Sequence, residues 1–209
     1  MRKKYTGLFI TFEGGDSTGK STQAKLLHEK MAGSVLTLEP GGTEIGKQIR
    51  KLVLDGTKEL SKAAEMLLFQ ADRAQHYKEI LKPALKDGKT VICDRYIDSS
   101  LIYQGHLRGW SLPLLFRIHN ACTGMLMPDI TFILDRTPED DVLNTNDTFE
   151  KQGGIFQQKV RDLYLHLGST HPRYRVISCN GKTVVQVHEE IMAGVEQYAN
   201  ENSGGRPRA

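Results

Sequence analysis

Cysteine is scarce in this chain of 209 residues. The three that occur, Cys93, Cys122 and Cys179, lie far apart and form no C-x-x-C pair, which argues against a disulfide framework. They have no metal-binding spacing with the seven histidines, which contain no H-E-x-x-H pair and are interpreted as surface or structural residues. Reduced thiols are the simplest interpretation, and we expect a cytoplasmic location.

Long apolar runs are also lacking. No window approaches the roughly 18 apolar residues that a transmembrane helix needs. Residues 2–4 are basic, as at the start of a signal peptide, but the apolar stretch 8–12 is shorter than a signal-peptide core and leads directly into Glu13 and Gly14. We therefore expect no association with a membrane.

The folded part of the chain lacks a basic excess. The formal net charge is +3, and five of the positive charges lie in the two ends, at Arg2, Lys3, Lys4, Arg206 and Arg208. Residues 1–6 and 202–209 carry no acidic residue, so the rest of the chain has a net charge of −2. A nucleic-acid-binding protein would carry its positive charge on the folded surface, so we expect no nucleic-acid partner.

What the sequence does contain is the composition and periodicity of one sizeable α/β domain. Hydrophobic residues make up 39% and charged residues 25%, as in an ordinary globular protein. Short apolar runs at 8–13, 35–38, 90–93, 130–134 and 174–178 indicate strands buried on both faces. Helical periodicity covers 20–31, 63–85, 112–125, 156–167 and 184–198. This alternation predicts a three-layer fold with a central five-stranded parallel sheet. We expect one domain over residues 7–200, with a flexible tail at 1–6 and a disordered one at 201–209.

A phosphate-binding motif follows the first predicted strand and opens the first predicted helix. Residues 14–21 match G-x-x-x-x-G-K-[ST], the P-loop pattern, in the context that the pattern requires. Glycines let backbone N–H groups surround an anion, and the helix N-terminus adds partial positive charge. The predicted ATP-binding residues are Gly14, Gly15, Asp16, Ser17, Thr18, Gly19, Lys20, Ser21 and Thr22. Lys20 is expected to reach the β- and γ-phosphates, and the hydroxyl of Ser21 to bind Mg²⁺.

A magnesium site also needs a carboxylate at the end of a neighbouring strand. Asp94 follows the run 90–93 and is therefore predicted at the carboxyl edge of the sheet, where open α/β folds bind ligands. Its alternative role is to cap the next helix. Together with the P-loop, Asp94 predicts an enzyme that uses a nucleoside triphosphate.

Four further segments resemble the thymidylate kinase family. Residues 8–16 resemble its opening, Glu39–Gly46 with Ile49 and Arg50 its second signature, 69–76 its third, and 94–105 its fourth and most specific. The resemblance covers roughly residues 7–200. It implies transfer of the γ-phosphoryl of ATP to dTMP, giving dTDP and ADP for dTTP biosynthesis, with Mg²⁺ as cofactor and a homodimer as the assembly.

The resemblance also implies a role for each matching residue. Lys20, Asp94 and Arg95 are the expected catalytic residues, and Ser21 and Asp94 the expected metal ligands. The resemblance implies that Arg50 and Arg95 clamp the acceptor phosphate, that Phe69 stacks on thymine, and that Arg73 donates to a thymine carbonyl. The other expected substrate-binding residues are Asp16 at the 3′-hydroxyl, Tyr103 beside the deoxyribose, Ser100 and Gln104 at the base edge, and Glu39 and Ser99. Taken singly, Phe69 and Tyr103 could be core residues, Arg50 a solvated charge, and Arg73 a surface partner of Asp72 or Glu65.

The sequence departs from the family where positive charge is expected near the transferred phosphoryl group. Ser17 stands where some members have a P-loop arginine, and Thr148 stands at a lid arginine position. The expected lid, at about 136–152, has no Arg or Lys between 137 and 149. Three explanations are open: Arg136, Lys151 or Arg161 substitutes; the enzyme is slow; or the chain binds nucleotide without efficient catalysis. A nucleoside-monophosphate kinase of altered base choice is the other alternative.

Overall fold

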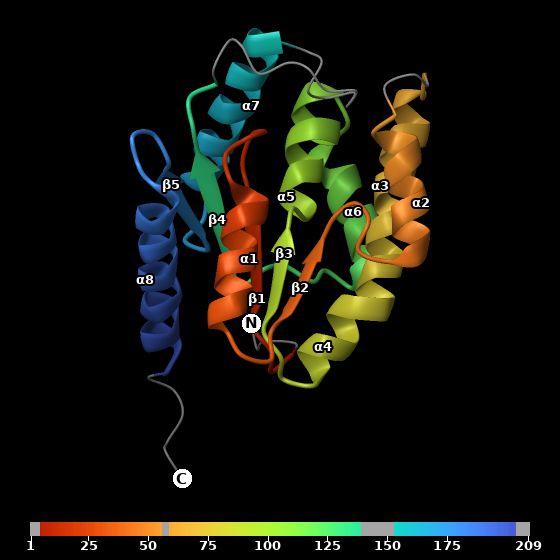
Figure 1. The fold of residues 1–209 in the computed structure, drawn as a ribbon. Helices are drawn as coiled ribbons and strands as arrows, with labels where there is room; N and C mark the ends of the chain where they lie inside the picture. The colour runs from red at the N-terminus through yellow and green to blue at the C-terminus, as the bar shows by residue number, and fades with distance from the viewer. Residues whose placement is uncertain (1–4, 56–58, 139–152, 204–209) are drawn as a thin grey trace.

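The computed structural model describes residues 5–55, 59–138 and 153–203. At its centre is a parallel sheet of five strands in the order β2-β3-β1-β4-β5, which confirms the predicted fold class (Figure 1). The strands are β1 (Phe9–Glu13), β2 (Val35–Leu38), β3 (Val91–Asp94), β4 (Ile130–Asp135) and β5 (Tyr174–Ser178). Each lies within one residue of its predicted bounds, because strands buried on both faces leave continuous β-branched and aromatic runs in the sequence.

Helices cover both faces of the sheet. Helices α1 (Lys20–Lys30) and α8 (Val184–Ser203) pack on one face, where Leu27 and Ile191 are fully buried against Phe12 and Phe132. The other face is covered by α3 (Lys62–His76), α6 (Leu112–Thr123) and α7 (Gly153–Gly168) with their neighbours. This three-layer arrangement leaves the carboxyl ends of the strands at one edge, which is where the loops that carry the predicted site begin.

The long helix predicted over 63–85 is interrupted rather than regular. It comprises α3, the π-helical segment η1 (Tyr77–Leu81) and α4 (Lys82–Lys86). Pro83 has no backbone N–H and its ring would collide with the carbonyl four residues earlier, so a wider turn ahead of it is the expected accommodation.

Two helical segments were not delimited from the sequence. Helix α2 (Glu44–Val53) is capped by Thr43, whose hydroxyl accepts a hydrogen bond from the Gly46 N–H at 2.9 Å. Helix α5 (Ile97–Ser100) continues into the π-helical segment η2 (Leu101–Leu107). Both follow strand ends, at β2 and β3 respectively, and they carry residues of the predicted site.

The chain ends differ in part from the prediction. Helix α8 continues to Ser203, five residues beyond its expected end at 198, and the Asn202 amide donates to the Tyr198 carbonyl at 2.8 Å. Most of the predicted lid, 139–152, lies outside the described residues, as do 1–4, 56–58 and 204–209. In the described part of the chain, no helix has the length and apolarity needed to span a membrane.

Candidate active site

The P-loop connects the end of β1 to the start of α1. Gly14 and Gly19 have φ angles of 137° and 93°, which favour glycine, and a side chain at Gly14 would collide with the Leu134 carbonyl oxygen. Thr18 Oγ1 donates to the Gly15 carbonyl at 3.0 Å. The loop therefore has the tight curvature that lets backbone N–H groups face an anion. Thr22 lies in the first turn of α1 and is exposed.

Lys20 is buried beneath this loop, with 7% of its surface exposed. Its ammonium donates to the Gly15 carbonyl and to Thr18 Oγ1, the latter at 3.3 Å. Burial and the neighbouring Arg95 lower the pKa of Lys20 to about 8, and the carboxylates of Asp94 and Asp16 act against them. A bound polyphosphate would add negative charge beside the ammonium and favour its charged form.

Asp94 and Ser21 meet at the carboxyl end of β3. Ser21 Oγ donates to Asp94 Oδ2 at 2.5 Å, whereas Asp94 Oδ1 is enclosed and has no hydrogen-bond partner within the described residues. A buried carboxylate oxygen without a partner beside a hydroxyl fits a hard divalent cation. The described residues contain no cluster of three or more acidic, histidine or cysteine side chains that could hold a metal without other ligands.

Arg95 is held by the P-loop and by helix α5, which begins two residues after Arg95. Nη2 lies 2.8 Å from Asp16 Oδ1, and Nη1 donates to the Gly14 carbonyl and to Ser99 Oγ, each at 3.2 Å. The guanidinium lies over the ring of Tyr103, 5.6 Å from its centroid. The structure thus brings together Arg95, Asp16, Ser99 and Tyr103, four of the residues predicted to bind substrate.

Glu13 contacts the residues around Arg95, although its position in the sequence did not predict a role in the site. It is fully buried and accepts hydrogen bonds from the Tyr96 N–H at 2.8 Å, Ser99 Oγ at 2.7 Å and Tyr164 OH at 2.9 Å. Burial, followed by the charge of Asp98, raises the pKa of Glu13 from 4.5 to about 7. Glu13 therefore orients the two hydroxyls, those of Ser99 and Tyr164, that lie beside Arg95 Nη1.

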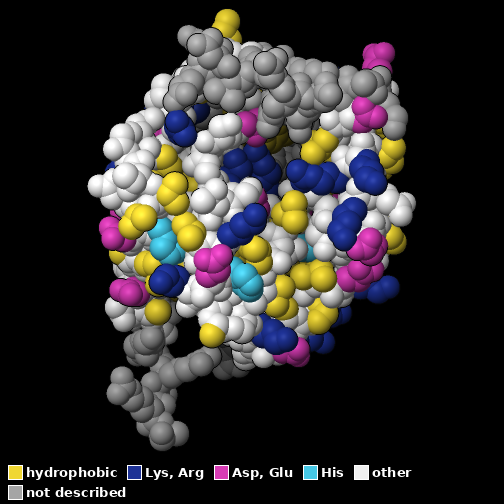
Figure 2. Space-filling view, viewed as in Figure 1, with side chains coloured by type: hydrophobic (Ala, Val, Ile, Leu, Met, Phe, Trp, Pro, Cys, Tyr) yellow, Lys and Arg dark blue, Asp and Glu magenta, His cyan; other side chains and the backbone are white. Residues whose placement is uncertain are grey.

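A cavity of about 280 Å³ adjoins the P-loop and is lined by all ten of the predicted substrate-binding residues. Figure 2 shows Lys and Arg side chains around a hollow in the upper half of this face. The residues that line the cavity include Asp16, Lys20, Ser21, Glu39, Arg50, Phe69, Arg73, Asp94, Arg95, Ser99, Ser100, Tyr103 and Gln104. P-loop residues and acceptor-side residues therefore face one space.

Arg50 and Arg73 are positioned by the loop after β2. Arg50 Nη1 donates to the Pro40 carbonyl at 2.8 Å. Arg73 is 2% exposed and its Nε donates to Glu39 Oε2 at 2.8 Å, so the alternative of a surface pair with Asp72 or Glu65 is wrong. His76 Nδ1 lies 2.7 Å from the other Glu39 oxygen. Burial acts to raise the pKa of Glu39, but Arg73 and His76 hold it below its ordinary value.

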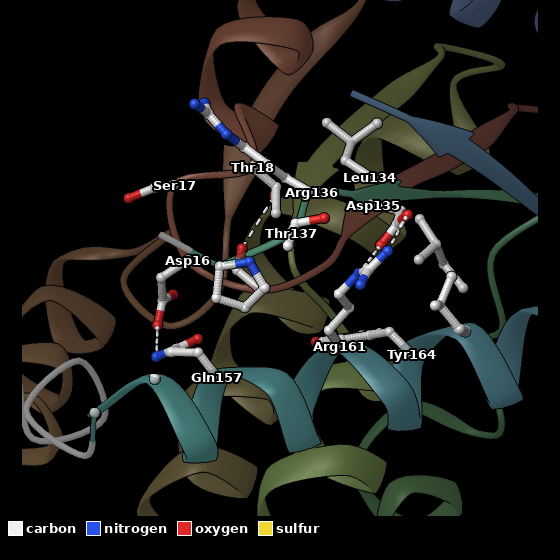
Figure 3. A pocket seen from close by; sticks show the side chains of 16 residues that line it. Asp16, Ser17, Thr18, Leu134, Asp135, Arg136, Thr137, Gln157, Arg161 and Tyr164 are labelled. Carbon is white, nitrogen blue, oxygen red and sulfur yellow. Dashed lines mark hydrogen bonds and ion pairs between the residues drawn. The ribbon is translucent and has the colours of Figure 1, made fainter. Parts of the chain in front are cut away.

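A second cavity, of about 270 Å³, lies between the P-loop, the end of β4 and helix α7 (Figure 3). From α7, Gln157 Nε2 donates to Asp16 Oδ2 at 3.0 Å, so both carboxylate oxygens of Asp16 are bound. Arg161 donates to both oxygens of Asp135, from Nε at 2.6 Å and from Nη2 at 3.1 Å. Gln157 was missed in the sequence, although it shares a helix face with Arg161 and Tyr164 at spacings of four and seven.

Of the three cations considered as replacements for the missing arginine, two lie in the described residues. Arg136 and Arg161 both line the second cavity, but the side chain of Arg136 points away from the Asp135–Arg161 pair in Figure 3. Lys151 and Thr148 lie outside the described residues.

A parallel sheet whose first strand leads into a P-loop, with a Ser–Asp pair beside it and arginines across one cavity, defines a P-loop phosphotransferase. The family model "Thymidylate kinase" matches residues 12–191. The chain belongs to the thymidylate kinase family.

Individual relatives agree with the family model. A thymidylate kinase of Gloeobacter violaceus is 40% identical, over 93% of this chain and 97% of its own length, and one of Symbiobacterium thermophilum is 41% identical, over 91% and 93%. Among solved structures, thymidylate kinase from Ehrlichia chaffeensis has a TM-score of 0.75 at 35% identity, over 91% of this chain and 98% of that one. The Candida albicans enzyme has a TM-score of 0.72 at 28% identity, over 95% of each chain.

Proposed function

We propose that this protein transfers the γ-phosphoryl group of ATP to dTMP, giving ADP and dTDP for dTTP biosynthesis. The observation that carries the proposal is that Lys20 of the P-loop opens onto the same cavity as Arg50, Phe69 and Arg73. A phosphoryl donor and a monophosphate acceptor can therefore meet in one enclosed space, as direct transfer requires. Membership of the thymidylate kinase family supports dTMP as the acceptor and favours neither alternative function.

Catalysis in this arrangement depends on position and charge. The transferring phosphoryl group spreads negative charge over its oxygens, so preorganised cations contribute most of the rate. Lys20 supplies one charge from the P-loop, and Arg95, which is bonded to Gly14 and Asp16 of the same loop, supplies another. Asp16, Ser99 and Tyr164 hold Arg95 at its guanidinium, which limits the reorganisation needed when the acceptor phosphate binds.

The acceptor base fits the end of the cavity farther along α3 and η2. Phe69 supplies an apolar ring for stacking, and Ser100 and Gln104 supply polar groups for the base edge. Arg73 provides guanidinium donors for a base carbonyl, while its Nε remains bonded to Glu39. Tyr103 lines the same cavity, where its ring would border the deoxyribose.

Mg²⁺ fits the Ser21–Asp94 pair. Ser21 Oγ and Asp94 would hold the ion, with phosphate oxygens and water as its remaining ligands. When bound, Mg²⁺ would neutralise negative charge on the phosphate groups. Without it, Ser21 donates to Asp94, which keeps both side chains in place.

Arg161 is the proposed substitute for the missing arginine. It lines the cavity beside Gly15, Asp16, Ser17 and Thr18, and its Nη1 has no hydrogen-bond partner in the described part of the chain. The paired Asp135 fixes its orientation from the end of β4. This arrangement supports an enzyme that turns over without a P-loop arginine.

A homodimer and a cytoplasmic location complete the proposal. Helices α2 and α3 form one outer edge of the molecule in Figure 1 and expose three large apolar side chains, Ile45, Leu52 and Leu67. Exposed apolar side chains on adjacent helices support a protein contact, and family membership supports a second copy as the partner. Cys93, Cys122 and Cys179 form no disulfide bond with one another, which supports a location where thiols stay reduced, such as the cytoplasm.

The test is ADP formation from Mg-ATP with dTMP, dUMP, dCMP, dGMP, AMP and UMP offered in turn. We expect dTMP to be the best acceptor and Lys20→Ala to lower its turnover by at least 10²-fold. Lys25→Ala, an exposed lysine on the same helix α1, is the matched control and should retain activity. Preference for another acceptor would support altered base choice, and dTMP binding without ADP formation would support a nucleotide-binding protein.

A further inference from the structure

The orientation of one buried amide in the acceptor cavity is determined by the groups behind it. Gln104 is 2% exposed and lines the cavity. Its Nε2 donates to Glu65 Oε1 at 3.2 Å. Within the described residues no donor lies within hydrogen-bond distance of Gln104 Oε1, and this oxygen is not enclosed, so it is open to the cavity.

The carboxylate of Glu65 cannot hydrogen-bond to the side-chain amide of Gln104 if that amide is reversed, with its oxygen toward Glu65. It is 5% exposed, and Arg108 donates to it from Nε at 3.3 Å and from Nη2 at 2.9 Å. An ionised carboxylate has only acceptor oxygens, so the group that faces it must be a donor. The NH₂ group of Gln104 must therefore point to Glu65, and its carbonyl oxygen must point to the ligand.

We propose that the Glu65–Arg108 pair is a positioning device that fixes Gln104 as a hydrogen-bond acceptor, and thereby selects acceptor monophosphates whose base carries an N3–H group. Thymine and uracil present a donor at N3, whereas cytosine presents an acceptor there. A site built around a buried polar contact rejects an analogue that leaves the contact unmade or opposed. This inference rests on the proposed function, since it concerns how the same cavity distinguishes pyrimidines.

The substitution Glu65→Gln makes a directional prediction. The amide introduced by this substitution would have one acceptor oxygen, and Arg108, which has only donors, would take it. The new NH₂ group would then face Gln104, whose amide would turn its oxygen toward the substituted side chain and its own NH₂ toward the cavity. That arrangement suits N3 of cytosine and opposes N3–H of thymine. Glu65→Met removes the constraint without reversing it, so its effect should have the same sign and be smaller.

The experiment compares kcat/KM for dTMP and for dCMP in the wild type, Glu65→Gln and Glu65→Met, using the whole chain. The matched control is Glu190→Gln, which removes an exposed carboxylate of α8 that pairs with Lys182 and lies far from the cavity in the fold. Cooperative thermal unfolding establishes that each variant is folded. Calorimetric binding of dTMP and dCMP gives the same selectivity ratio independently of turnover.

We expect the dTMP-to-dCMP ratio to fall at least tenfold in Glu65→Gln, less in Glu65→Met, and not in Glu190→Gln. A merely structural role for Glu65 would lower both activities together and leave the ratio unchanged, which would overturn the inference. If the glutamine variant does not fold, an unchanged ratio in Glu65→Met overturns it equally. The wild type's turnover of dTMP tests the proposed function separately, because the ratio measured by binding needs no transfer step.

Discussion

Burial of Glu13 predicts a specific pH dependence of stability. The pKa of Glu13 rises from 4.5 to about 7 on folding, chiefly because the carboxylate is removed from water and secondly because Asp98 is near. Between these two values the folded protein binds a proton that the unfolded chain releases, so folding stability falls as the pH rises. Below pH 4.5 the group is neutral in both states, and above pH 7 the loss is complete.

The magnitude follows from the two pKa values. One pKa unit corresponds to about 1.4 kcal/mol, so the difference between 4.5 and about 7 costs roughly 3 kcal/mol once the carboxylate ionises in both states. Most of this, about 2 to 3 kcal/mol, should develop between pH 5 and pH 8. Glu13→Gln keeps an acceptor for the Tyr96 N–H and cannot ionise, so its stability should lack this component.

The assay is urea unfolding of wild type and Glu13→Gln at several values between pH 5 and pH 8. As the pH rises from 5 to 8, the unfolding free energy of Glu13→Gln should increase by about 2 to 3 kcal/mol relative to that of the wild type. Glu196→Gln, on the exposed side of α8, serves as control and should follow the wild type at every pH. Parallel curves for wild type and Glu13→Gln would refute the reasoning.

Two further predictions concern charge at the P-loop. Asp94→Asn should raise the magnesium concentration needed for half-maximal activity by about 10- to 100-fold, because the enclosed oxygen loses its charge; a magnesium titration that matches the wild type would contradict the proposed ligand. Arg161→Ala should lower kcat for dTMP phosphorylation by about 10²-fold or more while changing the KM for dTMP little, because the lost charge acts in the transition state. Arg175→Ala, at a partly exposed pair with Glu201, should leave kcat unchanged, and an unaltered kcat in Arg161→Ala would leave Arg136 and Lys151 as the candidates.

The parts of the molecule that could be predicted from sequence are those specified by neighbouring residues. The P-loop is contiguous, and its glycines, lysine and serine carry the chemistry within eight positions. Strand β5, Tyr174–Ser178, has its predicted bounds because its residue types identify it without reference to a partner.

Helix α5 and segment η2 could not be predicted in the same way. Their sequence, 97–107, mixes β-branched, polar and glycine residues that are weak helix formers. The segment is stabilised by contacts with residues that are distant in the sequence. Arg173 donates to both oxygens of the fully buried Asp98, at 2.6 and 2.9 Å, from 75 positions away in the chain. A Cβ atom at Gly105 would lie 2.6 Å from Leu112 Cδ2, so the close packing there would have to shift for any larger residue.

The supporting residues of the site were missed for a related reason. Glu13 and Tyr164 are 151 positions apart, Gln157 and Asp16 are 141 apart, and Glu65 and Gln104 are 39 apart. None of these pairs forms a local motif. The residues expected to touch ligand were therefore identified by motif and resemblance, whereas those that orient them required the fold.

The left-handed backbone at Arg95, with φ at 69°, has a consequence for directed evolution. A non-glycine residue in that conformation costs roughly 1 to 2 kcal/mol, and the asymmetry of the chain makes glycine the residue that removes the cost. The position of the proposed phosphate clamp thus combines a backbone conformation that favours glycine with hydrogen bonds to Asp16 and Ser99 that the arginine side chain makes. A library selection for heat resistance alone would weigh relief of this backbone cost against loss of those contacts and would not read turnover, so a selection for robustness in this enzyme must score activity at the same time.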